Sequence, residues 1–160
     1  MSLIVYKNNT LYADDSGIVN TIDDTYYKKS KKLFKRAKTA IAFVGSEVDE
    51  ESEEFKKYFD EIEKHLENKD IQSFVVTYDL QLSNPCIVIT SSSVYSSIDG
   101  LSFQKLQNDI IITEGLEKHV ALICLTTCNM SVIETFNFIK DTTNPSYFTN
   151  IEQVLQFDLC

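Results

Sequence analysis

The sequence is poor in the residues from which phosphate and cofactor sites are usually built. It has four glycines, at positions 17, 45, 100 and 115, and they never gather into the glycine-rich loop that holds a phosphate group. Arg36 is its single arginine. Nucleotide binding of the usual kind is therefore not expected, and no cofactor is predicted.

The four cysteines show no metal-binding pattern. Cys86, Cys124, Cys128 and Cys160 contain no C-x-x-C pair. His119 lies five residues before Cys124 and nine before Cys128, which matches no common zinc site. We interpret the cysteines as reduced, buried thiols of the kind found in cytosolic proteins, and no metal site is predicted.

Long apolar runs are missing as well. No stretch approaches the roughly 18 consecutive apolar residues that a membrane-spanning helix needs. The first residues do not have the layout of a signal peptide. We therefore expect a soluble, cytoplasmic protein that does not enter a membrane.

What the chain does contain is enough for an ordered core. Its 160 residues are 43% hydrophobic, which predicts one globular domain over residues 1–160. The net charge of −9 opposes general nucleic-acid binding, because phosphate neutralisation needs a basic surface. Basic residues nevertheless cluster between positions 28 and 38, at Lys28, Lys29, Lys31, Lys32, Lys35, Arg36 and Lys38. We interpret this run as a solvated strand or loop face, with a nucleic-acid patch as the distant alternative.

The beginning of the chain predicts a tight β-hairpin. Leu3 to Tyr6 are apolar, β-branched or aromatic, as in a buried strand. Asn8 and Asn9 follow, and asparagine tolerates the left-handed backbone conformation that a short hairpin turn requires. Leu11 to Ala13 then form the returning strand.

The remaining pattern predicts strands and helices in an order that is not strictly alternating. Further strands are predicted at 39–44, 73–78, 86–90 and 108–112, with a returning strand in the 91–100 hairpin and a last strand around 154–159. The longest helix is predicted within 46–70, and the acidic cluster at its start is structural rather than a metal site. A second helix fits 116–125, with Leu116, Val120 and Ile123 on one face, and a third is capped by Asn129 or Ser131. This order suits an α+β fold of antiparallel sheets with helices on their faces.

The same segments, taken in order, carry a family resemblance. They are the opening strand "SLIVYKNNTLYADDSG", the lysine-led strand "KKLFKRAKTAIAFVGS", the acidic helix, the hairpin "CIVITSSSVYSSIDG", the turn "IIITEG" and the ending "NPSYFTNIEQVLQFDL". In this layout the chain resembles the proteasome β-subunit and HslV peptidase family of N-terminal nucleophile hydrolases. The resemblance implies a four-layer αββα sandwich, with two antiparallel sheets between helix layers.

The resemblance also implies a nucleophile at the amino end. In that family the first residue of the processed chain attacks through its hydroxyl, and its own α-amino group acts as the base. The matching position here is Ser2, which becomes the first residue once Met1 is removed. Gly45 matches the glycine whose backbone N–H stabilises the oxyanion.

A charged pair is implied beside that nucleophile. Asp15 matches the buried aspartate of the family, and Asp14 is the second choice. Lys32 matches the lysine that this aspartate orients, and Lys31 would take its place if the register shifted by one residue. A cation near the amine lowers its pKa, and near the hydroxyl it favours the alkoxide.

Several positions depart from the family pattern. Leu3 stands at a position that is usually small or polar, Glu114 replaces a serine that assists near the amine, and Asn144 replaces an aspartate. A retained Met1 would also mask the amine of Ser2. Two hypotheses follow: a serine-type peptidase or amidase that uses Ser2, or a catalytically silent member, a pseudoenzyme that serves as a scaffold or protein-interaction module.

The resemblance further implies partners. Family members assemble into rings, so we expect self-association into a ring or a smaller homo-oligomer through the helix faces and the 91–100 hairpin. A protein or peptide partner, such as a separate ATPase, is also implied. Nucleic acid is not an expected partner.

Overall fold

The computed structural model of the chain describes residues 3–20, 22–23, 25–44, 48–77, 84–143 and 150–160. Within these residues it is an α+β protein with two large antiparallel sheets and a separate two-stranded hairpin. The strands are β1 (Leu3–Lys7), β2 (Thr10–Asp14), β3 (Ser16–Asn20), β4 (Thr25–Lys29), β5 (Leu33–Lys35), β6 (Thr39–Phe43), β7 (Ser73–Val75), β8 (Cys86–Thr90), β9 (Val94–Ser97), β10 (Ser102–Leu106), β11 (Ile112–Gly115) and β12 (Ile151–Leu155). The helices are α1 (Glu53–Leu66), α2 (Lys118–Thr126) and α3 (Val132–Thr143), and a 3-10 turn covers Gln156–Asp158.

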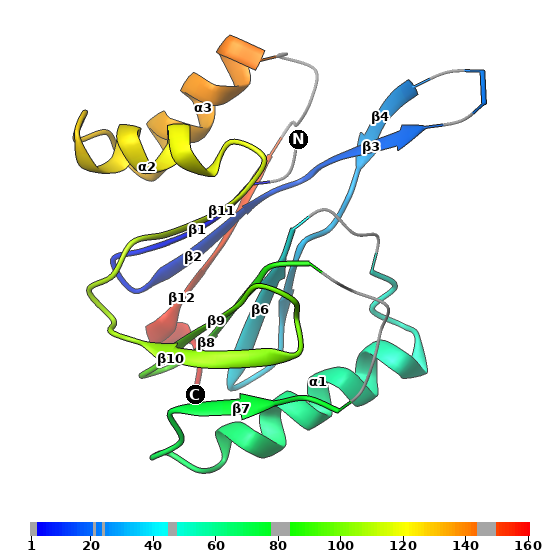
Figure 1. The fold of residues 1–160 in the computed structure, drawn as a ribbon, viewed down its shortest axis with the longest axis vertical. Coiled ribbons are helices and arrows are strands. Elements are labelled where there is room, and N and C mark those ends of the chain that lie inside the picture. Colours follow the sequence, from blue (N-terminus) through cyan, green and yellow to red (C-terminus); the bar gives the residue numbers. More distant parts are fainter. Residues whose placement is uncertain (1–2, 21, 24, 45–47, 78–83, 144–149) are drawn as a thin grey trace.

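The two sheets stack between helix layers. One sheet has the strand order β11-β1-β2-β12 and the other has the order β5-β6-β8-β9-β10-β7. Figure 1 shows α2 and α3 covering the first sheet and α1 covering the second, while the β3–β4 hairpin projects from the sandwich. The predicted four-layer αββα architecture is therefore confirmed.

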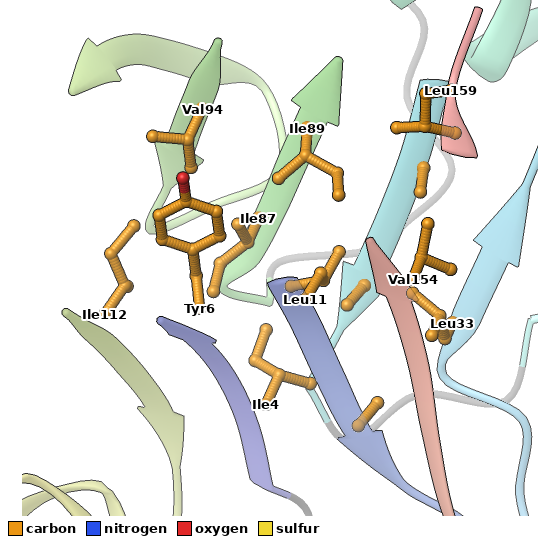
Figure 2. Close-up of a cluster of buried hydrophobic side chains, with 13 residues drawn as sticks. Ile4, Tyr6, Leu11, Leu33, Ile87, Ile89, Val94, Ile112, Val154 and Leu159 are labelled. Atoms are coloured by element: carbon orange, nitrogen blue, oxygen red, sulfur yellow. The ribbon is translucent and has the colours of Figure 1, made fainter. Parts of the chain in front are cut away.

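Three separate apolar cores fill the three spaces between these layers. The core between the sheets includes Ile4 and Leu11 from one side and Ile87 and Ile89 from the other (Figure 2). The second core joins the six-stranded sheet to α1, and the third joins the four-stranded sheet to α2 and α3. Because side chains alternate along a strand, each buried strand supplies two cores at once.

The opening hairpin forms as the sequence predicts. β1 pairs with β2 through the register Lys7↔Thr10, and Asn8 and Asn9 between them have φ values of 51° and 60°. Both asparagines thus adopt the left-handed conformation that a two-residue hairpin turn needs. The turn fixes the pairing register of β1 with β2, and this register sets the position of the beginning of β1 relative to the end of β2.

The helix boundaries follow from capping side chains. Ser52 caps α1 by accepting a hydrogen bond from the Phe55 amide at 3.2 Å. At α3, Ser131 accepts from the Glu134 amide at 3.1 Å while the Glu134 carboxylate accepts from the Ser131 amide at 2.9 Å, which is a capping box. The cap of α3 is therefore Ser131 rather than Asn129.

Three predictions about the second half need correction. The last strand expected around 154–159 is β12 at Ile151–Leu155, and a 3-10 turn follows it from Gln156 to Asp158. The strand expected at 108–112 does not exist as such: β10 ends at Leu106, a turn follows, and β11 begins at Ile112 and runs to Gly115. The predicted stripe of α2 is also not its buried face, because Leu116, Val120 and Ile123 are all exposed. α2 packs inward instead through Ala121, Cys124 and Leu125.

Candidate active site

A buried ion pair lies beside the start of β1. The Asp14 carboxylate, at the end of β2, accepts a hydrogen bond from the Leu3 amide through Oδ1 at 2.8 Å. The same Oδ1 atom lies 3.2 Å from the Lys32 ammonium nitrogen, and the two charged side chains are 0% and 1% exposed. The pair therefore connects the first described residue of the chain to a cation in an almost dry environment.

The neighbouring strands hold this pair in place. Lys32 directly precedes β5, and its carbonyl accepts from the Phe43 amide of β6 at 2.9 Å. Its Nζ also donates to the Asp14 carbonyl at 3.2 Å and to the Ser16 carbonyl. Together with the Asp14 carboxylate, these oxygens match the three N–H groups of an ammonium. Lys32 is thus fixed by acceptors from the β2–β3 junction.

Burial sets the electrostatics of the pair. Removal of water lowers the pKa of Lys32, and the opposite charge and hydrogen bond of Asp14 partly oppose this shift, with smaller contributions from the charges of Asp15 and Glu152. A lysine with a lowered pKa releases its proton more easily than one on the surface. Such a perturbed group, close to a chain end, is typical of a functional site.

Ser16 is a member of this site that the sequence interpretation missed. Its hydroxyl donates to Asp14 Oδ2, and its carbonyl accepts from Lys32, so it contacts both charged groups. It is 1% exposed. The signal that could have found it is its spacing, since a serine two residues after an aspartate is well placed to donate to that carboxylate.

Of the two neighbouring acidic candidates, the structure places Asp14 in contact with Lys32, whereas the sequence favoured Asp15. Asp15 Oδ1 instead accepts from the Asn150 amide at 3.2 Å, and its carbonyl accepts from the Ser30 amide at 2.8 Å. The ion pair of Lys32 is with Asp14, while Asp15 acts on Lys32 through its charge. Asp14, the second choice from the sequence, therefore forms the ion pair, and the catalytic role of either aspartate stays a prediction.

The neighbouring lysine has a different environment. Lys31 is exposed and pairs with Glu50, its Nζ lying 2.9 Å from Oε2. Arg36 pairs with Asp60 and Glu63 at 2.6 and 2.7 Å. Local carboxylates thus already neutralise part of the 28–38 basic run, which counts against a nucleic-acid patch there.

Glu114 lies on the other side of β1. β11 pairs with β1 through Leu3↔Gly115 and Ile4↔Glu114, so the turn residues of the family pattern are here part of a strand. The Glu114 carboxylate lies 3.6 Å from the Lys118 ammonium at the start of α2. Gly115 has a φ of 124°, a conformation that favours glycine at this strand end.

Three predicted site residues, Ser2, Gly45 and Asn144, lie outside the described residues. Ser2 is bonded to the Leu3 nitrogen that donates to Asp14. Within the described ranges there is no group of three or more histidine, cysteine, aspartate or glutamate side chains that could hold a metal ion. Nor does this part of the chain contain a helix long and apolar enough to cross a membrane.

The layer order and the position of β1 define the sandwich found in N-terminal nucleophile hydrolases. Among solved structures, eukaryotic HslV from Trypanosoma brucei is similar, with 15% identity and a TM-score of 0.57 over 96% of this chain and 98% of that chain. BPH from Thiobacillus denitrificans in complex with epoxomicin gives 10% identity and a TM-score of 0.52, covering 96% of each chain. A second structure of that BPH gives 9% identity and a TM-score of 0.52, covering 96% of this chain and 95% of that chain.

The likeness is confined to structure. No protein-family model matches the sequence, and no curated protein matches it. At identities this low, the comparison shows that the chain has a proteasome- and HslV-like fold.

Proposed function

We propose that the chain is a serine-type N-terminal nucleophile hydrolase that cleaves amide bonds, with Ser2 as nucleophile after removal of Met1. One observation carries this proposal: the Leu3 amide, covalently joined to Ser2, donates to the buried Asp14–Lys32 pair. Burying two charges costs several kcal/mol per ion before their attraction compensates, so such a pair is an expensive way to hold a strand end. The lysine of this pair has a lowered pKa, and the pair holds the amide that adjoins the candidate nucleophile. A role in the reaction would explain why so costly a pair is buried here.

The proposed reaction uses the two groups of one residue. The Ser2 hydroxyl attacks the carbonyl carbon of the amide, and its proton passes to the Ser2 α-amine, whose ordinary pKa is near 8. The C–N bond then breaks, the amine leaves with that proton, and an ester joins Ser2 to the acyl group. Water cleaves the ester and restores the hydroxyl. Lys32 would stabilise the developing negative charge on the serine oxygen, and Gly45 would donate its N–H to the oxyanion.

Intact mass spectrometry with a covalent probe tests the proposal. A β-lactone is opened by an activated hydroxyl and leaves a stable ester, so the wild-type protein should lose Met1 and gain one probe mass on Ser2. Ser2→Ala is the matched control, because alanine also permits removal of methionine and keeps the α-amine but lacks the hydroxyl. Retention of Met1, or equal labelling of wild type and Ser2→Ala, would reject the mechanism.

A second candidate function is a catalytically silent scaffold, and two contacts favour it. Lys32 already has three oxygen acceptors, from Asp14 and Ser16, so its N–H groups are used without a nucleophile. Glu114 stands where active family members carry a serine, and it pairs with Lys118. Loss of Met1 without any labelling of Ser2 would select this candidate.

The proposal extends to setting and assembly. All four cysteines are free, although Cys128 and Cys160 are exposed rather than buried as the sequence predicts. Free cysteines are common in the reducing cytoplasm, and we propose that the protein acts there. Self-association is proposed as well, since it is what the family resemblance implies. The number of copies is left to measurement of the mass in solution.

A further inference from the structure

Two of the four cysteines lie one helical turn apart at the end of α2. Cys124 belongs to the helix and is 4% exposed, whereas Cys128 is exposed. Residues four positions apart in a helix lie on the same side of it, one above the other. The pair therefore combines a shielded thiol with a thiol that solvent can reach.

The backbone holds both cysteines in one closed turn. The Cys128 amide donates to the Ile123 carbonyl at 3.1 Å, and the Met130 amide donates to the Cys124 carbonyl at 2.9 Å. Asn129 has a φ of 51°, the left-handed conformation that commonly ends a helix. Cα atoms four residues apart on a helical path are about 6 Å from each other, and a disulfide accepts about 4.4–6.8 Å.

The two thiols also interact electrostatically. Burial raises the pKa of the Cys124 thiol, and the charge of Cys128 raises it further, because two thiolates close together repel each other. The other two cysteines lie elsewhere. Cys86 belongs to the core beneath α1, and Figure 1 shows the C-terminus, at Cys160, on the far side of the sandwich from α2. Cys124 and Cys128 are thus the two thiols positioned to react with each other.

This arrangement is typical of redox-sensing thiols. Such thiols are accessible to solvent and often lie next to a second cysteine, which captures the oxidised sulfur. Disulfides that form in the reducing cytoplasm, where we propose that the protein acts, are usually transient and serve sensing or catalysis. Cys128 fits the accessible position and Cys124 fits the capturing one.

We propose that Cys124 and Cys128 form a peroxide-sensitive site that closes reversibly to a disulfide. The Cys128 thiolate attacks one oxygen of hydrogen peroxide, the O–O bond breaks, and a sulfenic acid and hydroxide result. The Cys124 thiol then loses its proton and attacks the Cys128 sulfur, and the S–O bond breaks with release of water. Two thiols and one peroxide thus become one disulfide and two waters, and a dithiol reductant reverses the change. The inference goes beyond the proposed hydrolase activity and does not depend on it.

Closure of the disulfide should change how α2 supports β1. A disulfide needs Cβ atoms about 3.5–4.5 Å apart, whereas side chains one helical turn apart have Cβ atoms about 5–6 Å apart. Cys124 must therefore move toward Cys128 and out of its buried position. The adjacent Leu125 shares the third core with Leu3, so we expect oxidation to loosen the packing at the start of β1.

Peroxide treatment followed by peptide mass analysis tests the site. The full chain is treated with hydrogen peroxide at about pH 8, where thiols are partly ionised, and the remaining thiols are blocked with N-ethylmaleimide in denaturant. One tryptic peptide, residues 119–140, contains both cysteines, because no lysine or arginine lies between positions 119 and 139. In wild type this peptide should lose two hydrogen atoms, take up no maleimide and recover both thiols after treatment with dithiothreitol.

Three serine variants are the controls. Cys124→Ser and Cys128→Ser should give no disulfide in this peptide, whereas Cys160→Ser, at the other exposed cysteine, should leave the disulfide unchanged. In Cys124→Ser the sulfenic acid has no partner, so sulfinic acid on Cys128 should accumulate about tenfold above wild type at the same peroxide dose. Because Cys128 is exposed, Cys128→Ser tests the site even if Cys124→Ser does not fold.

Hydrogen exchange tests the effect on β1. Oxidation should speed exchange of the β1 amides in wild type and leave it unchanged in Cys128→Ser. Equal exchange in oxidised and reduced wild type would reject this effect. The site itself would be rejected if peptide 119–140 kept both thiols under peroxide, gained only oxygen on Cys128, or paired Cys128 with Cys160. None of these measurements uses Ser2, so failure of this inference is distinguishable from failure of the proposed activity.

Discussion

The Lys32 ammonium and the Asp14 carboxylate lie 3.2 Å apart, and both side chains are withdrawn almost completely from water. They come from different sheets, since Asp14 ends β2 and Lys32 precedes β5. The pair is thus a polar crosslink between the two halves of the sandwich. It lies at the end of β1 where the proposed nucleophile is attached.

Removing one partner of this pair should destabilise the fold strongly. Asp14→Asn leaves the Lys32 charge buried without its counter-ion, so we expect a loss of about 3–5 kcal/mol in the free energy of unfolding. Combining it with Lys32→Met should recover part of that loss, because no charge then remains buried. Urea unfolding of the two single variants and the double variant measures both effects.

Lys31→Met is the control for that experiment. Lys31 pairs with Glu50 on the surface, and exposed pairs contribute about 0–1 kcal/mol. Two results would contradict the role of the buried pair as a crosslink. One is an equally small loss of stability in Lys31→Met and Lys32→Met. The other is strict additivity, in which the double variant loses as much stability as Asp14→Asn and Lys32→Met together.

Arg36 should anchor α1 to the six-stranded sheet. Its guanidinium donates to Asp60, Glu63 and the Lys56 carbonyl, and it lies 4.1 Å from the centre of the Phe59 ring. We expect Arg36→Ala to cost about 1–2 kcal/mol, because it removes two ion pairs of Nη1, a hydrogen bond of Nη2 and a cation–π contact. Arg36→Lys should recover only part of this, since an ammonium has a single nitrogen in place of the two that donate here.

Thermal and urea unfolding give the size of the Arg36 effect, and Lys35→Ala serves as its control. Lys35 is an exposed neighbour, so its removal should change stability by less than about 0.5 kcal/mol. Equal stability of Arg36→Lys and wild type would show that only the charge matters and would contradict the geometric role.

The sequence predicted those parts of the fold that depend only on residues close together in the chain. Asn8 and Asn9 adopt positive φ because asparagine tolerates it, and the turn they form fixes the β1–β2 register. The helix predicted within 46–70 is α1, and its residues Phe55, Phe59 and Ile62, which recur at helical spacing, are all buried. Each of these predictions needed only neighbouring residues.

Where the pattern was ambiguous, the prediction was wrong or incomplete. Ile110 to Ile112 form an unbroken apolar run, which lacks the alternation that would locate the strand start, and β11 begins only at Ile112. α2 has apolar side chains on its exposed side as well as on its buried side, so its spacing could not identify the buried side. Asp14 and Asp15 are adjacent, and only three-dimensional contact decides which of them faces Lys32.

Gln156 should be the polar link at the opposite end of the sandwich. Its amide donates to the Thr90 and Ser93 carbonyls at 3.0 Å each and accepts from the Tyr6 hydroxyl at 2.9 Å, and it is 2% exposed. Gln156→Leu should cost about 2–4 kcal/mol in unfolding free energy, because it removes three hydrogen bonds of a buried side chain. Gln156→Glu should be worse near neutral pH and partly recover in acid, where the buried carboxyl is protonated.

A double-mutant cycle with Tyr6→Phe isolates the Tyr6–Gln156 contact. Because Tyr6→Phe removes the hydroxyl that Gln156→Leu would leave with only the Asn108 carbonyl as acceptor, the two losses should sum to more than the loss in the double variant. Strict additivity would mean that this hydrogen bond contributes nothing and that the side chains act independently.

Cys86 should make the fold sensitive to alkaline pH. Its thiol is buried in the core beneath α1, and burial raises its pKa above the ordinary value of 9.0. Above about pH 9 the unfolded chain releases this proton while the folded chain keeps it, so the unfolded state binds fewer protons and stability falls as pH rises. At about pH 10 this linkage amounts to about 1.4 kcal/mol relative to neutral pH.

Cys86→Ala should remove that part of the slope, whatever its cost at neutral pH. Burial also raises the pKa of Tyr58, with smaller contributions from Cys86, so the comparison is made in a Tyr58→Phe background. Urea unfolding of both proteins at about pH 8 and about pH 10 measures the two slopes, and parallel slopes would mean that Cys86 ionises in the folded protein.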